Sequence, residues 1–264
     1  MKIPIYQVDA FASRVFAGNQ AAVCPLKQWL PDELLQSIAQ ENNLSETAFF
    51  IEEKGVYHIR WFTPKAEVDL CGHATLATAH VIINCMEQQS DMVSFISKSG
   101  LLKVTQQEHL LTLDFPKLDP KPCVAPKDLL DGLRVEPKDV APDEVLFAKD
   151  YIVVYGTGSD VSLCHPDLSK LKTLDARGVA ITAPGNDVDF VSRFFAPKLG
   201  IAEDSVTGSL HCAITPYWAK RLGKTRLTAN QLSERGGELI CTDNGDRILI
   251  SGQAVEFMRG EIKL

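Results

Sequence analysis

Two matched helix starts suggest a binding site for an anion. Gly72-His73 and Gly208-Ser209 each follow a strand and an acidic segment, and each is expected to open a helix. A helix N-terminus presents unpaired N–H groups and roughly half a positive charge, and glycine lets a ligand approach the backbone closely. For one start alone, the simpler interpretation is an ordinary helix capped by Thr207 or Ser209. Because both starts share this context, the pair favours a carboxylate site.

Glu46 is the candidate for proton transfer. It enters a strand that continues as Ala48-Phe49-Phe50-Ile51, which is wholly apolar. A carboxylate at the mouth of such a strand tends to lose its hydration, which raises its pKa toward the range of a useful general acid or base. On the sequence alone, a solvated glutamate at a strand end remains the simpler interpretation.

Many short strands and a few helices are expected to position these residues. Helices are predicted over 31–41, 72–86 and 208–222, and a hairpin is predicted to pair 47–53 with 57–62. The helix at 72–86 is rich in alanine and leucine and has a wide apolar face. These patterns indicate a mixed structure in which strands and helices share one chain.

The two halves of the chain resemble each other. Arg60-Trp61-Phe62-Thr63-Pro64-Lys65 matches Arg193-Phe194-Phe195-Ala196-Pro197-Lys198 at four of six positions. Each hexamer ends a predicted strand and is followed by an acidic linker and a helix that opens at glycine. We therefore predict a duplicated, pseudo-twofold protein. Prolines crowd between positions 116 and 142, so the lobes are expected at 1–118 and 119–264, with the last strand allowed to pack on the first lobe.

Composition excludes several classes of function. The 264 residues carry a formal charge of -7 and no basic run, which argues against nucleic-acid and membrane partners. No signal peptide or membrane span is apparent. The seven cysteines are an odd number and include no Cys-x-x-Cys pair, so free thiols in the cytoplasm are expected and a metal knuckle is not.

The sequence calls for no cofactor. Gly156-Thr157-Gly158 starts a dinucleotide fingerprint, but no helix is expected to follow directly. Gly223-Lys224-Thr225 imitates the end of a phosphate-binding loop, yet it follows a helix rather than opening one. We therefore predict that neither a nucleotide, a flavin nor a metal is required.

The chain resembles the phenazine-biosynthesis (PhzF-like) isomerases, relatives of diaminopimelate epimerase. The matching segments extend over nearly the whole chain and include Cys71-Gly72-His73-Ala74-Thr75 and Glu203-Asp204-Ser205-Val206-Thr207-Gly208-Ser209. Further matches are Val8-Asp9-Ala10-Phe11, Gly18-Asn19-Gln20-Ala21-Ala22-Val23 and Leu44-Ser45-Glu46-Thr47. The resemblance implies an α+β fold of two pseudo-symmetric lobes, each a curved, barrel-like sheet around a central helix, with the active site between the lobes.

The resemblance also implies roles for residues. Glu46 would move a proton on a small carboxylated substrate without a cofactor. His73, Asp204 and Ser209 fall on positions that line the family's site, the backbone at Gly72 and Gly208 would help bind the carboxylate, and Asn19 would form a further wall of the pocket. The family commonly forms dimers, so a homodimer is expected.

Two other functions remain open. The epimerases use two thiols, and here Cys71 occupies the first thiol position while Ser205 falls opposite the second. A two-cysteine epimerase or racemase is therefore the second choice. A binding protein that kept the fold without activity is the third. His211 follows Ser209 by two residues, and the sequence does not determine which way it faces.

Overall fold

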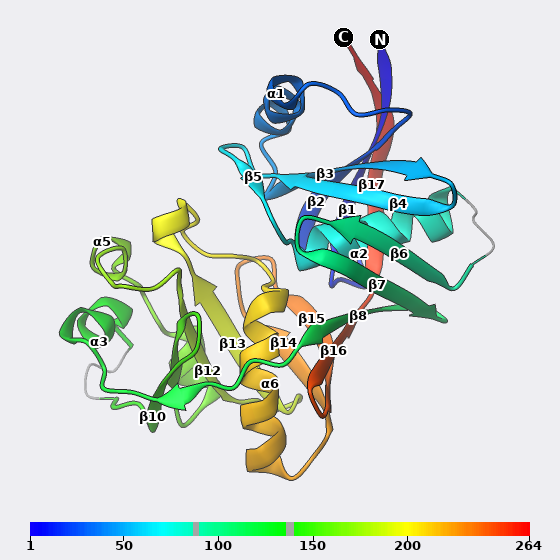
Figure 1. Ribbon diagram of the computed structural model, residues 1–264. Coiled ribbons are helices and arrows are strands. Elements are labelled where there is room, and N and C mark those ends of the chain that lie inside the picture. The colour runs from blue at the N-terminus through cyan, green and yellow to red at the C-terminus, as the bar shows by residue number, and fades with distance from the viewer. Residues whose placement is uncertain (87–89, 136–139) are drawn as a thin grey trace. The chain divides into compact units, whose positions relative to one another are not determined.

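The computed structural model describes residues 1–86, 90–135 and 140–264, which form two compact units (Figure 1). The first unit comprises Met1–Asp114 together with Ser251–Leu264, and the second comprises Phe115–Ile250. The division thus falls four residues before the expected one at 118/119, and the last fourteen residues belong to the first unit. They contain the final strand, which pairs with the first strand of the chain over Lys2–Ala10.

The first unit is a curved sheet with two helices. The strands of this unit are β1 (Lys2–Ala10), β2 (Asn19–Leu26), β3 (Glu46–Glu53), β4 (Val56–Phe62), β5 (Glu67–Val68), β6 (Met92–Ser97), β7 (Gly100–Gln107), β8 (Leu110–Pro116) and β17 (Ala254–Lys263). Its helices are α1 (Asp32–Asn42) and α2 (Gly72–His80), and a π-helix, Val81–Cys85, continues α2. The predicted helix over 72–86 therefore changes its hydrogen bonding after His80. The Met86 N–H bonds to the Val81 carbonyl, five residues back, where a β-branched run lowers α-helix propensity.

The second unit contains the remaining elements. Its strands are β9 (Lys121–Pro122), β10 (Glu144–Phe147), β11 (Tyr151–Val154), β12 (Val179–Pro184), β13 (Phe190–Phe195), β14 (Arg226–Gln231), β15 (Gly237–Asn244) and β16 (Arg247–Gly252). Its helices are α3 (Lys127–Leu133), α4 (Gly158–Ser162), α5 (Leu168–Leu171), a 3-10 turn at Pro197–Leu199, and α6 (Gly208–Leu222). The expectation that no helix follows Gly156-Thr157-Gly158 is wrong, because α4 begins at Gly158. A capping box between Thr157 and Asp160 stabilises this short helix.

The two units share one succession of strand pairings. In the first unit, β17–β1 and β1–β2 are antiparallel, β2–β3 parallel, β3–β4 antiparallel, β4–β6 parallel and β6–β7 antiparallel. In the second, β9–β10 and β10–β11 are antiparallel, β11–β12 parallel, β12–β13 antiparallel, β13–β14 parallel and β14–β15 antiparallel. In both units the long helix lies between the fifth and sixth strands of this series along the chain. The shared order supports a duplicated design.

The matched hexamers make the same contacts in both units. Arg60 forms two hydrogen bonds with Glu67, at 2.7 and 2.9 Å, and lies 5.1 Å from the ring centroid of Phe62. Arg193 does the same with Glu203, at 2.7 and 3.0 Å, and lies 5.0 Å from the Phe195 ring. In each copy, the ion pair ties the end of a strand to the acidic linker that leads to the central helix.

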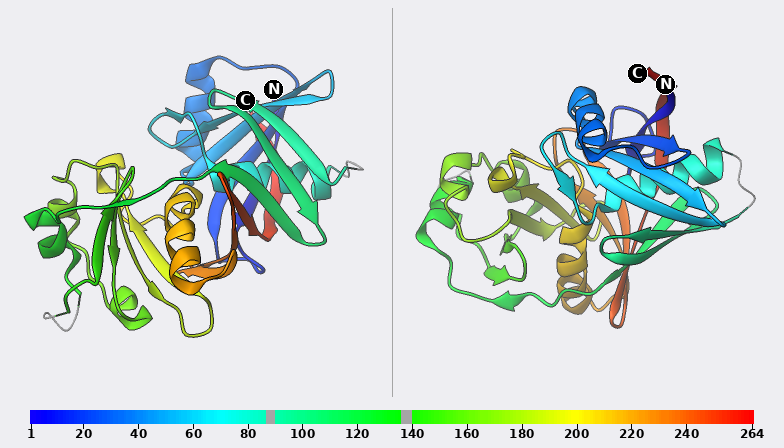
Figure 2. Two further views of the ribbon diagram at one scale, coloured as in Figure 1. Left: turned by 60° about the horizontal axis from the view of Figure 1, so that its bottom comes forward. Right: turned by 45° about the horizontal axis from the view of Figure 1, so that its top comes forward.

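The two central helices are buried. Seven consecutive residues of α2, from His73 to Ala79, are buried, which is typical of a helix surrounded by its own domain. It packs against β1, β2, β3, β7 and β17 (Figure 2). In the second unit, α6 packs against β14 and β15 and buries nine of its fifteen residues. The expected α+β class, with curved sheets and few helices, is confirmed. Among the described residues, no helix combines the length and apolar character needed to cross a membrane.

Candidate active site

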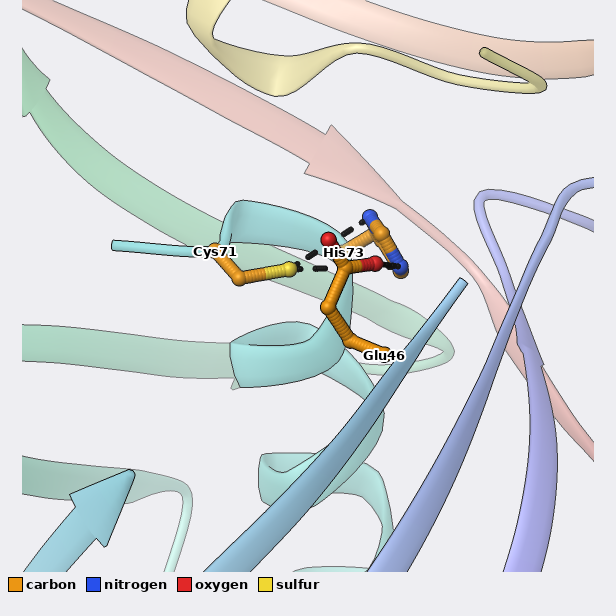
Figure 3. A group of neighbouring side chains, drawn as sticks. All are labelled: Glu46, Cys71 and His73. Carbon is orange, nitrogen blue, oxygen red and sulfur yellow. Dashed lines mark hydrogen bonds and ion pairs between the residues drawn. The ribbon is translucent and has the colours of Figure 1, made fainter. Parts of the chain in front are cut away.

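Three chain segments bring polar side chains to the start of α2. Glu46 is the first residue of β3, Asn19 is the first residue of β2, and Cys71 and His73 flank the glycine that opens α2. The parallel pairing of β2 with β3 places Ala21 opposite Glu46, so the two strands begin side by side. Figure 3 shows the Glu46 carboxylate and the Cys71 sulfur directed at the His73 ring.

His73 is the centre of this group. Its Nε2 lies 2.9 Å from Glu46 Oε2, and its Nδ1 lies 3.2 Å from Asn19 Nδ2 and 3.6 Å from Cys71 Sγ. The Ser45 hydroxyl donates to Asn19 Oδ1 at 3.0 Å. Although Glu46 Oε2 forms an ion-pair contact with His73, it receives no well-aligned hydrogen bond from the described residues. The ion-pair contact therefore holds the carboxylate close to the ring.

The group is largely withdrawn from water. The side chains of His73 and Glu46 are 7% and 12% exposed, so the desolvation expected for Glu46 is present. Burial disfavours the charged imidazolium, but the negative charges that Cys71 and Glu46 can carry outweigh it and raise the pKa of His73 well above its usual value. Burial and the Glu46 charge raise the pKa of the Cys71 thiol. The raised pKa favours the neutral thiol, which disfavours Cys71 as the base.

Gly18 fixes the position of Asn19. Its φ is +66°, and a Cβ added there would lie 2.2 Å from the Ala10 carbonyl oxygen. Only glycine fits this close turn between β1 and β2. The turn delivers Asn19, which is fully buried, to the Nδ1 side of His73.

The N-terminus of α2 carries no side-chain cap in the described structure. Cys71 is the N-cap in an extended conformation, and among the described residues no side chain caps this helix at that position. Its first N–H groups, at Gly72 and His73, therefore remain suited to an anion.

The start of α6 is built differently in the second unit. The Thr207 hydroxyl donates to Asp204 at 2.6 Å, so in the described structure it does not cap the helix as the simpler interpretation expects. Gln231 accepts from the Thr207 N–H at 2.8 Å and donates to the Asp204 carbonyl at 2.7 Å. This network orders the segment that leads to Gly208 and Ser209.

An arginine holds Ser209. Arg177 Nη2 donates to Ser209 Oγ at 3.0 Å, and the same guanidinium forms an ion pair with the buried Asp150 at 2.5 Å. His211 is fully buried, and its Nδ1 lies 2.9 Å from the Thr207 carbonyl. Burial, opposed by this hydrogen bond, lowers the pKa of His211 to about 4. His211 therefore faces the core as a neutral side chain.

The structure thus brings some of the expected site residues together. Asn19, Glu46, Gly72 and His73 lie in one group in the first unit. Asp204, Gly208 and Ser209 lie in the second unit, in the segment that leads to α6 and in its first two residues. Sequence reasoning did not predict the roles of Ser45, Asp150, Arg177 and Gln231. Ser45 adjoins Glu46 in the Leu44-Ser45-Glu46-Thr47 motif, but each of the other three lies 24 to 32 residues from the residue it contacts.

One donor set can hold a metal. Single ligand atoms of Glu46, Cys71 and His73 all lie within 4.8 Å of one another. Carboxylate, thiolate and imidazole are the three ligand types that zinc takes in proteins.

Comparisons with known proteins bear on the family and the fold of the chain. The sequence model of the phenazine biosynthesis-like protein family matches residues 8–260. An uncharacterized isomerase of Pseudomonas aeruginosa is 50% identical over 264 residues, which covers 100% of both chains. A crystal structure of a PhzF-family phenazine biosynthesis protein from Enterococcus faecalis is 46% identical and covers 100% of both chains, with a TM-score of 0.96. A predicted epimerase from Pseudomonas aeruginosa, 19% identical over 99% of both chains with a TM-score of 0.78, shares the fold alone.

The family match extends from Val8 to Gly260 and so includes both helix starts and Glu46. Relatives of 50% and 48% identity along the full chain are named as isomerases. The chain therefore belongs to the phenazine biosynthesis-like protein family, and its class of activity is that of an isomerase.

Proposed function

We propose that the protein moves a proton within a small carboxylated substrate, with Glu46 as the general acid and base and without a cofactor. The observation that carries the proposal is the Glu46 carboxylate, 12% exposed and 2.9 Å from His73 at the open start of α2. A carboxylate that is desolvated and held near its target is suited to accept and return a proton.

The proposed proton transfer has two steps. Glu46, ionised beside His73, takes a proton from one carbon of the substrate and becomes a neutral carboxylic acid. It then donates the proton to another carbon, which completes an isomerisation with no change in the number of atoms or electrons. His73 stabilises the ionised form of Glu46 before the first step and after the second. Asn19 keeps the imidazole in place through its 3.2 Å contact with Nδ1.

The substrate carboxylate is the proposed ligand of the helix starts. The Gly72 and His73 N–H groups supply local positive potential, which the overall charge of -7 does not. Gly208, Ser209 and Asp204 are proposed as further substrate-binding residues on the ground of the family motif alone.

The test is proton exchange measured by NMR in deuterated buffer. Carboxylated aromatics and amino acids are first screened for binding by thermal shift, and the binders are then followed for deuterium uptake. Glu46→Gln should reduce uptake at least about 100-fold while the thermal unfolding temperature stays close to that of the wild type. Glu53→Gln is the matched control, because Glu53 ends the same strand and its side chain is 63% exposed.

Three results would overturn the assignment. Unchanged uptake in Glu46→Gln would exclude Glu46 as the base. Loss of chirality at an amino-acid α-carbon, with Cys71→Ser more damaging than Glu46→Gln, would favour an epimerase or racemase. Binding with no exchange by the wild type would favour a non-catalytic binding protein.

The remaining expectations belong to the same proposal. A homodimer, a cytoplasmic location and a biosynthetic role follow from the resemblance to the family. Light scattering during size-exclusion chromatography tests the first: a mass of one chain, 29.1 kDa, would contradict it.

A further inference from the structure

A second chemical capacity lies in the same three side chains. Glu46, Cys71 and His73 offer one oxygen, one sulfur and one nitrogen donor from two elements of one unit (Figure 3). Proton transfer by Glu46 does not use the thiol, and Cys71 is buried, with 6% of its surface exposed. We propose that this trio is a zinc-binding site and that zinc bound there inhibits the enzyme by occupying Glu46.

The distances between the donors are close to those around a zinc ion. In a tetrahedral site with Zn–S near 2.3 Å and Zn–N near 2.05 Å, sulfur and nitrogen lie about 3.5 Å apart and nitrogen and oxygen about 3.3 Å apart. Cys71 Sγ lies 3.9 Å from His73 Nε2, and Glu46 Oε2 lies 2.9 Å from the same nitrogen. Shifts of about 0.4 Å would bring these two pairs to the zinc values. The sulfur and the carboxylate oxygen lie within 4.8 Å of each other, and the Cys71 side chain, whose sulfur is 3.6 Å from Nδ1, would turn toward Nε2 on binding.

The charges balance. On binding zinc, Cys71 loses its thiol proton and contributes one negative charge, Glu46 contributes a second, and His73 binds as the neutral ring. The sum of -2 neutralises Zn²⁺, as a site with this little exposure requires. The thiol proton of Cys71 and the second proton of the His73 imidazolium go to solvent, and no oxidation or reduction takes place.

The surroundings support metal binding through Nε2. A zinc-bound imidazole carries its remaining proton on the other nitrogen and donates it to a polar group. Here Nδ1 faces the amide of Asn19, 3.2 Å away. Rotation of that amide by a half turn would present its oxygen as the acceptor. Since Glu46 Oε2 receives no aligned hydrogen bond from the described residues, the ion would also give this buried oxygen a direct partner.

Three protein ligands leave the fourth zinc position for water or a substrate carboxylate. The metal would hold the Glu46 oxygen and block the proton transfer, so inhibition rests on the proposed function, whereas binding does not.

Cobalt substitution tests binding without any substrate. Metal-free full-length protein is titrated with Co²⁺, and we expect one equivalent to bind with a thiolate-to-cobalt charge-transfer band, which Zn²⁺ then displaces. Cys71→Ser should abolish the band and weaken Zn²⁺ binding at least about 100-fold. Glu46→Gln should weaken binding and keep the band. Cys85→Ser is the matched control, because Cys85 is a half-buried thiol that also lies beside a carboxylate and donates to Glu256 at 3.1 Å.

The outcomes separate the two proposals. No band in the wild type, or a band lost in Cys85→Ser and kept in Cys71→Ser, overturns the zinc site. A band that depends on Cys71, with Zn²⁺ halting deuterium uptake over the range in which it binds, supports both the site and inhibition. A band that depends on Cys71 in a protein with no exchange on any substrate leaves the zinc site standing and counts against the proposed function.

Discussion

His211 should make the protein sensitive to mild acid. Its ring is fully buried on α6, and burial lowers its pKa to about 4 from the usual 6.5. In the unfolded chain the same ring titrates at the ordinary value, so between these two values the unfolded state binds more protons than the folded state. The free energy of unfolding therefore falls as the pH falls from 6.5 toward 4.

The magnitude follows from the two pKa values. Relative to high pH, the loss from this one residue is about 0.2 kcal/mol at pH 7, about 2 kcal/mol at pH 5 and about 3 kcal/mol at pH 4.

His211→Asn isolates this contribution. Asparagine has no titratable group, and its amide can still donate to the Thr207 carbonyl, which the His211 Nδ1 reaches at 2.9 Å. Urea unfolding of both proteins between pH 7.5 and 4.5 gives the free energy of unfolding at each pH. The variant loses the ring contact with Phe190, which lowers its stability at every pH, so the pH slope is the quantity to compare. Parallel slopes for the two proteins would refute the assignment of a neutral, buried His211.

Two further predictions concern the turn before β2 and the ion pair between β4 and the linker that follows it. Gly18→Ala should lower the free energy of unfolding by more than about 2 kcal/mol, since φ is +66° and the new Cβ would lie 2.2 Å from the Ala10 oxygen. Gly55→Ala, at φ +79° with open space around it, should cost only about 1 kcal/mol, and equal losses in urea would contradict the steric argument. Arg60→Lys should cost about 1–2 kcal/mol, because lysine cannot replace both bonds to Glu67. Hydrogen bonding to Arg60 lowers the pKa of Glu67 to about 2, so this cost should shrink as the pH falls below 4.5, and a cost that does not depend on pH would count against the ion pair.

The sequence predicted what is encoded locally. The helix start at Gly208 and the end of α6 at Leu222 follow from a glycine opening and an apolar pattern, and they agree with the structure. The duplicated hexamers predicted two related units because they recur with the same context. The π-helix after His80 was missed, since a β-branched run reads as continuous apolar helix until its hydrogen bonds are known.

Contacts between distant segments could not be predicted in this way. The Glu46–His73 contact joins residues 27 positions apart, and it depends on where β3 begins relative to α2. The Arg177–Ser209 bond spans 32 residues, and nothing in the sequence near Arg177 indicates it. The family motif identified Glu46, His73 and Ser209 as candidates, whereas their partners required the three-dimensional structure.

The duplication places opposite charges at equivalent points of the two units. In the first unit, Glu46 begins β3, which pairs in parallel with β2. Glu46 contacts His73, the second residue of α2. In the second, Arg177 stands two residues before β12, the equivalent strand, and contacts the second residue of α6, Ser209.

One framework therefore holds a carboxylate against an imidazole in one copy and a guanidinium against a hydroxyl in the other. The first arrangement can exchange a proton, because both of its groups can change charge. The second cannot, because an arginine side chain stays charged and its ion pair with Asp150 fixes it in place. It can only add positive potential and orientation beside the Gly208 helix start. The asymmetry between the copies supports the proposal that proton transfer takes place in the first unit, and for that reason the decisive substitutions lie at Glu46 and Cys71.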